Sequence, residues 1–286
     1  MKRKSLIWTM VVLAVAVMFV FTACQQTTRP VHLEESALSG KVTLIGSTSV
    51  QPLAEDLSIA FMDMYPDVQV DVQGGGSSVG IQSVMDGLCD IGDASRNLKE
   101  EEKGKGLVEH VVALDGIAVV VHPSNTAADL TVEQVKQIYE GDITNWKDAG
   151  GADAEIIVLT REAASGTRGA FIELVGLEEE VEGEDVVTIT EEALESNSNG
   201  ALKTNVSTKE NAIGYVSLGS IDDTVKALKV DGVDATAENV KNGTYGLFRP
   251  FLMLTNGEPQ GVVKIFLDYV LGDGQAIVSE NYISVD

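Results

Sequence analysis

Two arginines and two hydroxyl side chains surround the start of one predicted helix, in the segment LTREAASGTRGAF. Arg161 comes before a run of small residues, and Ser165, Gly166 and Thr167 then open the helix. The start of a helix presents unpaired backbone N–H groups with a partial positive charge, and a guanidinium can bind two oxygens at once. This combination predicts a site for an oxyanion. Arg168, in the first turn, is explained equally well as a surface residue.

Two other segments repeat the arrangement of a strand, a small polar loop and a helix. LIGSTSVQPLA carries Ser47 and Thr48, and VQGGGSSVGIQ carries Ser77 after three glycines. Each loop taken alone is also explained by helix capping and turn formation, for which Ser, Thr and Gly are the preferred residues. Three such loops in one chain, one of them beside Arg161, favour a shared oxyanion site.

Short apolar runs alternate with amphipathic helical patterns from Gly40 onward. This alternation predicts an α/β fold with largely parallel sheets, in which ligands bind at the carboxyl ends of the strands. The segment 178–187 is predicted to be an acidic, solvated loop. The predicted strands are 41–46, 68–73, 116–123, 155–160, 212–219 and 250–257, and the predicted helices are 50–66, 79–88, 131–141, 166–176 and 260–272.

Composition and motifs exclude several classes of function. The formal net charge of −24 argues against a nucleic-acid partner and requires any anion site to depend on local donors. No lysine follows the glycine-rich loop, so it is not a Walker A loop, and the serine of AASGT is not in a G-x-S-x-G elbow. The three histidines lack the spacing of metal ligands. No metal and no cofactor are therefore expected.

The N-terminus has the pattern of a lipoprotein signal peptide. Basic residues precede a long apolar run, which ends in small residues before Cys24. We expect residues 1–23 to be removed, Cys24 to be lipidated and residues 24–39 to form a flexible tether. The alternative is an uncleaved transmembrane helix, since the run is about long enough to span a bilayer. Cys89 is then left without an intrachain partner and is expected to be a small buried hydrophobic residue.

The ordered motifs resemble those of the substrate-binding lipoproteins of bacterial phosphate ABC transporters. In order, they are GSTSVQPLAE, QGGGSSVGIQ, CDIGDASRNL, IYEGDITNWKD, TREAASGTRGAF and NAIGYVSLGS, and the likeness extends from about Gly40 to Asp286. The resemblance implies a two-lobed class II periplasmic-binding-protein fold with a hinge and a ligand cleft between the lobes. Lobe one would comprise residues 40–115 and 249–286, and lobe two residues 116–248.

The resemblance also implies a function without catalysis. A monomer, anchored by its lipid to the extracytoplasmic face of the membrane, would bind dehydrated inorganic phosphate by lobe closure. It would deliver the phosphate to the transmembrane subunits of an ABC permease. Carried over by position, the phosphate contacts would be Ser47, Thr48, Ser77, Ser95, Arg96, Arg161, Ser165, Gly166 and Thr167.

Two departures from the family pattern leave alternatives open. Ser95 stands where many members have the aspartate that accepts the proton of hydrogen phosphate, which leaves Asp93 or another acid as a replacement. Ala163 and Ala164 stand where an acid usually pairs with the binding arginine, although Glu162 is adjacent.

These departures keep open a receptor for sulfate, molybdate or tungstate. A secreted phosphate-ester hydrolase, with Ser165 or Thr167 as nucleophile and Arg161 as oxyanion donor, is disfavoured by the lack of a nearby base. A sensing or adhesive role on the same fold remains a further alternative.

Overall fold

The structure is a computed structural model that describes residues 38–181 and 183–285. Leu38–Asp286 form one compact unit. The predicted signal peptide, Cys24 and nearly all of the predicted tether lie outside the described residues, so they stay predictions. Of the helices in the described part, none is both long and apolar enough to cross a membrane.

The first part of the fold alternates strands and helices as the sequence predicts. Helix α2 carries Pro52 in its first turn, where the missing N–H is not needed, and it ends just before Pro66. Strand β2 shows the alternating burial expected from VQVDVQ at its start. The elements are β1 (Gly40–Gly46), α2 (Gln51–Met64), β2 (Val68–Gly74), α3 (Ser77–Met85) and β3 (Ile91–Ala94).

The middle part begins with one long strand. The predicted strand 116–123 is the second half of β4, which starts at Leu107. A capping box between Thr131 and Gln134 starts α4, and Gly141 ends it with a φ of 87°. The elements are β4 (Leu107–Val121), β5 (Asp129–Leu130), α4 (Val132–Glu140), η1 (Trp146–Ala149), β6 (Ile157–Arg161), α5 (Gly166–Val175), β7 (Glu178–Val181) and β8 (Glu184–Val187).

The last part completes the sheet and adds two C-terminal helices. Its long strand β13 and its amphipathic helix α8 match the predicted segments to within two residues at each end. The elements are β9 (Leu194–Ser196), α6 (Asn199–Thr208), β10 (Ala212–Ser217), η2 (Leu218–Ser220), β11 (Lys226–Ala227), β12 (Lys229–Val230), α7 (Ala237–Lys241), β13 (Phe248–Asn256), α8 (Gly261–Leu271) and α9 (Gln275–Asn281).

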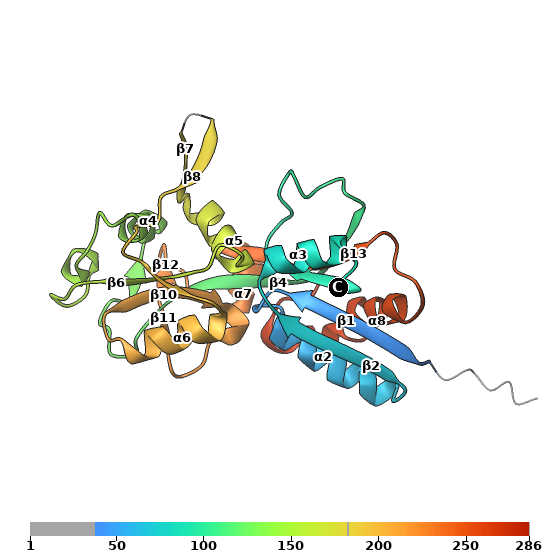
Figure 1. Cartoon of the computed structure of the whole chain (residues 1–286). Helices are drawn as coiled ribbons and strands as arrows, with labels where there is room; N and C mark the ends of the chain where they lie inside the picture. The colour runs from blue at the N-terminus through green and yellow to red at the C-terminus, as the bar shows by residue number, and fades with distance from the viewer. Residues whose placement is uncertain (1–37, 182, 286) are drawn as a thin grey trace, which may run out of the picture. The chain divides into compact units, whose positions relative to one another are not determined.

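Nine of the described strands form one sheet, in the order β2-β1-β3-β13-β4-β10-β6-β9 with β11 also paired to β4. The prediction of a largely parallel sheet is wrong at its centre, where β4 runs antiparallel to β13 and to β10. A strand buried on both faces has the same continuous apolar run whichever way it runs, so the sequence pattern did not distinguish parallel from antiparallel pairing. Strand β4 thus joins the two ends of the sheet, as Figure 1 shows.

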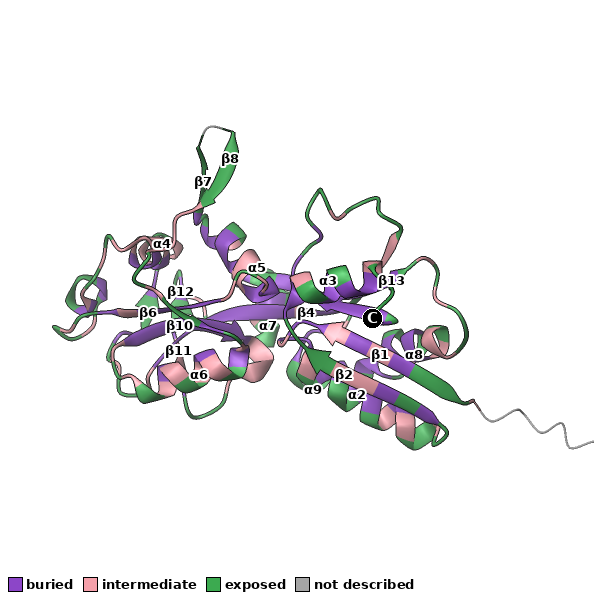
Figure 2. Ribbon diagram, in the orientation of Figure 1, coloured by how far each residue is buried: buried purple, intermediate pink, exposed green. Residues whose placement is uncertain are grey.

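The buried apolar residues gather in separate clusters along this sheet (Figure 2). One cluster packs α2, α8 and α9 against β1 and β13, with the rings of Phe61 and Phe266 5.2 Å apart. Another packs α4 and α5 around β10, where Phe171 stacks on Tyr215 at 4.0 Å. The fold is the predicted two-lobed α/β class, and the proposed lobe boundaries stay a prediction.

The acidic segment 178–187 is not the loop that we predicted. Strands β7 and β8 pair as an antiparallel hairpin, with Glu180 opposite Asp185. The described residues of the two strands are exposed except Val187, which is half-buried (Figure 2). The acidic composition was the reason for predicting a loop, because charged side chains favour solvent. A two-stranded ribbon with both faces in solvent exposes these side chains equally well.

Candidate functional site

The three predicted loops meet at the carboxyl ends of their strands. They connect β1 to α2, β2 to α3 and β6 to α5. The backbone N–H of Gly76 donates to the carbonyl of Gly46 at 2.8 Å, and the N–H of Ser78 donates to the carbonyl of Ala164 at 3.1 Å. The loops therefore contact one another directly through their backbones, although they are far apart in the sequence.

Glycines make this close approach possible. Gly76 has a φ of 97°, and a side-chain carbon there would lie 2.7 Å from the carbonyl oxygen of Ala164. A side-chain carbon on Gly166 would lie 2.8 Å from both Cβ of Ser77 and Oγ of Ser95. The start of α5 thus packs directly on Ser77 of the second loop and on Ser95, which follows β3.

One group of buried hydroxyls joins three serines. The Ser47 hydroxyl donates to Oγ of Ser95 at 2.8 Å, while Oγ of Ser47 accepts the backbone N–H groups of Ser49 and Val50 at 3.1 and 3.4 Å. Oγ of Ser77 accepts the backbone N–H of Ser95 at 3.0 Å and lies 3.5 Å from Oγ of Ser95. Three of the four predicted serines are therefore brought together, and none of these three is more than 3% exposed.

A second group contains residues that the sequence analysis did not select. The hydroxyls of Ser49 and Thr167 lie 2.6 Å apart, and Nδ2 of Asn199 donates to Oγ of Ser49 at 2.5 Å. Arg249 donates through Nη2 to both hydroxyls, at 3.2 and 3.0 Å. Arg249 and Asp115, its ion-pair partner at 3.0 Å, are polar residues within otherwise apolar strand patterns, which is the signal that could have revealed them.

Arg161 is fully buried at the carboxyl end of β6. Its Nε and Nη2 both donate to the carboxylate of Glu162 at 2.8 Å, and Nη2 also donates to Oγ1 of Thr48 at 3.2 Å. Glu162 is thus the acid that pairs with this arginine. Nη1 of Arg161 is buried and has no hydrogen-bond partner among the described residues, so it is a charged donor available to an oxyanion.

Two other predicted contacts, Arg96 and Ser165, are placed differently. The guanidinium of Arg96 forms a two-pronged pair with Glu102 at 2.7 and 2.8 Å and donates to Oγ of Ser78, so its charge is already neutralised. Ser165 caps α5 by accepting the backbone N–H of Arg168 at 3.2 Å. The capping explanation therefore describes its hydroxyl well, whereas no side chain caps α2 or α3.

Two buried carboxyl groups have perturbed acidity. Burial raises the pKa of Asp93 well above its usual value, and its Oδ1 has no hydrogen-bond partner in the described part of the chain. Burial also raises the pKa of Asp115, to about 6, although Arg249 and the Ser217 hydroxyl, which donates at 3.0 Å, oppose the shift.

Burial likewise raises the pKa of Cys89 to about 11, as expected for a small buried side chain without a disulfide partner.

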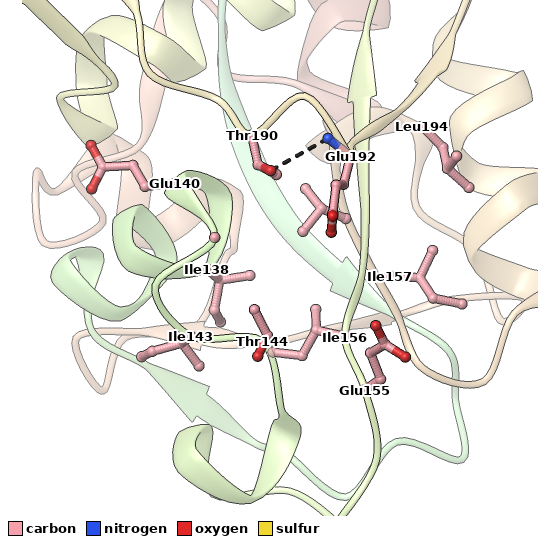
Figure 3. Close-up of a pocket in the computed structure, with 12 residues that line it drawn as sticks. Ile138, Glu140, Ile143, Thr144, Glu155, Ile156, Ile157, Thr190, Glu192 and Leu194 are labelled. Carbon is pink, nitrogen blue, oxygen red and sulfur yellow. Dashed lines mark hydrogen bonds between the residues drawn. The ribbon is translucent and has the colours of Figure 1, made fainter.

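This hydroxyl-rich site is distinct from a pocket of about 600 Å³ beside α4 and β6. Figure 3 shows that pocket, where isoleucines such as Ile138 and Ile143 lie near Glu155 and Glu192. Its lining contains no arginine or lysine but three glutamates, so it lacks a cationic donor for an oxyanion. The described residues also contain no cluster of three His, Cys, Asp or Glu side chains suited to a metal ion.

Comparison with known proteins establishes the family. The model of the PBP superfamily domain matches residues 33–274, so the chain belongs to that superfamily. It is 32% identical to the phosphate-binding protein PstS of Bacillus subtilis, over 100% of this chain and 95% of the relative. The predicted family of phosphate-transporter binding proteins is thereby confirmed.

Solved structures agree with this assignment. One, described as a phosphate ABC transporter substrate-binding protein from Clostridium perfringens with bound phosphate, is 46% identical with a TM-score of 0.82; the match covers 86% of this chain and all of that one. An ABC-type phosphate transport receptor from Vibrio cholerae is 39% identical with a TM-score of 0.68, covering 85% and 99% of the two chains.

Proposed function

We propose that this chain is an extracytoplasmic receptor that binds inorganic phosphate and delivers it to the permease of an ABC transporter. The observation that carries the proposal is the buried, unpartnered Nη1 of Arg161 beside a cluster of buried hydroxyls. A buried charged donor without a partner is costly unless a ligand accepts from it. The names of the relatives supply the identity of that ligand.

The proposed phosphate contacts come from all three loops. Arg161 would supply the charged hydrogen bond, and the hydroxyls of Ser95 and Thr167 would supply neutral ones. Backbone N–H groups at the starts of α2, α3 and α5 would add further donors. Ser47, Thr48, Ser77, Ser165 and Gly166 would complete or support the site, and Arg96, paired with Glu102, would support it indirectly.

Lobe closure would couple binding to delivery. Thr167 on α5 contacts Ser49 before α2 and Arg249 on β13, so the anion site is made by both predicted lobes. A ligand that contacts both lobes stabilises the closed arrangement relative to the open one. A lipid on Cys24 would keep the receptor near the permease, with residues 24–39 as the tether.

The preference for phosphate over sulfate is the finer part of the proposal. Ser95, which accepts the Ser47 hydroxyl, stands at the position where many family members have an acid. The proton of hydrogen phosphate then needs another acceptor, for which Asp93 and Asp115 are the buried candidates. A receptor for a fully ionised oxyanion such as sulfate is the second candidate, because a hydroxyl at Ser95 can donate to such an anion, whereas a carboxylate would repel it.

Catalysis is not part of the proposal. Thr167 contacts Ser49 and Arg249, and Ser165 is engaged as a helix cap, so neither hydroxyl has a base as its hydrogen-bond partner among the described residues. Hydrolysis of a chromogenic phosphate ester that is lost in Ser165→Ala or Thr167→Val would contradict the receptor assignment.

The direct test is calorimetric titration of the full chain, purified in a mild detergent and freed of ligand. Phosphate and then sulfate are added at several pH values between about 5 and 9, because phosphate changes its protonation near neutrality and sulfate does not. We expect one phosphate to bind per chain while sulfate is ignored. Equal or tighter sulfate binding would favour the second candidate, and no binding of either anion would overturn the receptor proposal.

A further inference from the structure

Arg249 and Asp115 form a buried ion pair across two central strands. They are directly opposite each other in the register of β13 and β4, with Nη1 of Arg249 3.0 Å from Oδ2 of Asp115. Both side chains are at most 2% exposed, and Oδ1 of Asp115 also accepts the Ser217 hydroxyl. This pair has no direct place in the predicted set of phosphate contacts.

The remaining nitrogens of Arg249 are directed at the anion site. Nε donates to the carbonyl of Ser95 at 3.0 Å, and Nη2 donates to the hydroxyls of Ser49 and Thr167. A guanidinium has only N–H donors and no acceptor. Both hydroxyl oxygens must therefore act as acceptors toward Arg249, which constrains where their own protons can point.

The number of lone pairs on each oxygen fixes the direction of the hydrogen bond between Ser49 and Thr167. A hydroxyl oxygen has two acceptor positions and one proton. Ser49 accepts from Arg249 and from Asn199, so its own proton is donated to Thr167 across the 2.6 Å contact. Thr167 accepts from Arg249 and from Ser49, which fills both of its acceptor positions.

The proton of Thr167 is consequently free for a ligand. Among the described residues, no acceptor other than Ser49 lies within hydrogen-bond distance of this hydroxyl. We propose that Arg249, held by Asp115, is a positioning residue. It orients the hydrogen bond from Ser49 to Thr167, so that Thr167 presents its proton to the bound oxyanion. The inference rests on the proposed function and deepens it, because it identifies how one of the site's donors is prepared.

The test compares phosphate affinity in four versions of the full chain, purified in detergent and titrated calorimetrically. Arg249→Lys keeps a cation beside Asp115 but removes the planar fork that reaches Ser49, Thr167 and the carbonyl of Ser95. Thr167→Val removes the hydroxyl that would donate to the anion. The remaining two versions are the double variant and the wild type.

We expect Arg249→Lys to weaken phosphate binding about 10- to 100-fold, the effect of one misdirected buried hydrogen bond. In the Thr167→Val background the same substitution should change affinity less than about threefold, because the proton that it orients is already gone. Tyr245→Phe is the matched control. It deletes a buried hydrogen bond of 2.8 Å to the carbonyl of Ile117, also on β4, and it should leave the affinity unchanged.

Two results would overturn the inference: wild-type affinity in Arg249→Lys, or a full loss that persists in the Thr167→Val background. If circular dichroism shows that Arg249→Lys does not fold, Asn199→Ala takes its place. It removes one of the two donors to Ser49, so we expect a smaller loss of phosphate affinity, and no further loss in the Thr167→Val background. An unchanged affinity in Asn199→Ala would contradict the proposed direction of the Ser49–Thr167 hydrogen bond. A wild type that binds no phosphate would instead refute the proposed function itself.

Discussion

Replacement of Gly166 by alanine is the perturbation with the most direct structural consequence. The added methyl group would overlap Oγ of Ser77 and would lie 2.8 Å from Cβ of the same residue, whereas carbon atoms pack at about 3.5 to 4.0 Å. Helix α5 must therefore move away from α3 by about 1 Å. The helix itself should tolerate alanine, because alanine is the better helix former and Gly166 has no positive φ.

The shift acts on the hydrogen bonds between the loops. A movement of about 1 Å would lengthen the 2.6 Å contact between Ser49 and Thr167 to about 3.6 Å, beyond the range of a hydrogen bond. The contact of Arg249 with Thr167 would weaken in the same way. Two such bonds, at about 0.5 to 1.5 kcal/mol each, total about 1 to 3 kcal/mol. Phosphate affinity should fall about 5- to 150-fold.

Titration calorimetry measures this loss, and thermal unfolding separates it from misfolding. Gly166→Ala should still unfold in one cooperative transition without ligand, at a temperature lowered by a few degrees because of the lost contacts, while the rise in unfolding temperature that phosphate gives to the wild type should be reduced. Gly200→Ala is the matched control, because Gly200 also lies in the first turn of a helix but its nearest neighbouring atom would be 4.0 Å away. An affinity within threefold of wild type, or an equal loss in both variants, would refute the reasoning.

Three further predictions follow from the same structure. Arg161→Lys should weaken phosphate binding about 10- to 100-fold in calorimetry, because an ammonium group lacks the planar fork by which Nε and Nη2 bind Glu162 while Nη1 stays available to the anion. Burial raises the pKa of Asp115 from 3.8 to about 6, so the folded state holds a proton that the unfolded state lacks between about pH 4 and pH 6. The free energy of unfolding should therefore fall with rising pH in that window, by about 3 kcal/mol relative to Asp115→Asn, as urea unfolding would measure; a constant difference would contradict the shift. Phe61→Ala should lower the free energy of unfolding by about 3 to 5 kcal/mol, because it empties a core position 5.2 Å from the ring of Phe266. The folded fraction of that variant should bind phosphate normally, and weakened binding would show that the core and the site are coupled.

The sequence by itself located the three loops and many of the elements, although β3, α6 and α9 were not among those predicted. Apolar periodicity and turn residues are local signals, so β1, α2, β2 and α5 were predicted within about two residues of their observed bounds. The combination of Ser, Thr, Gly and Arg after strands was enough to predict an oxyanion site. The order of six short motifs was enough to predict the family.

Only the tertiary structure decided which polar groups share the site and how they are paired. Asp115 and Arg249 become cross-strand neighbours because β13 pairs with β4, and no local pattern announces that pairing. Arg96 has the residue type of an anion ligand, yet a two-pronged pair with Glu102 occupies it. Hydrogen bonds and ion pairs depend on distances of about 3 Å between residues far apart in the chain, and those distances exist only after the strands have taken their register.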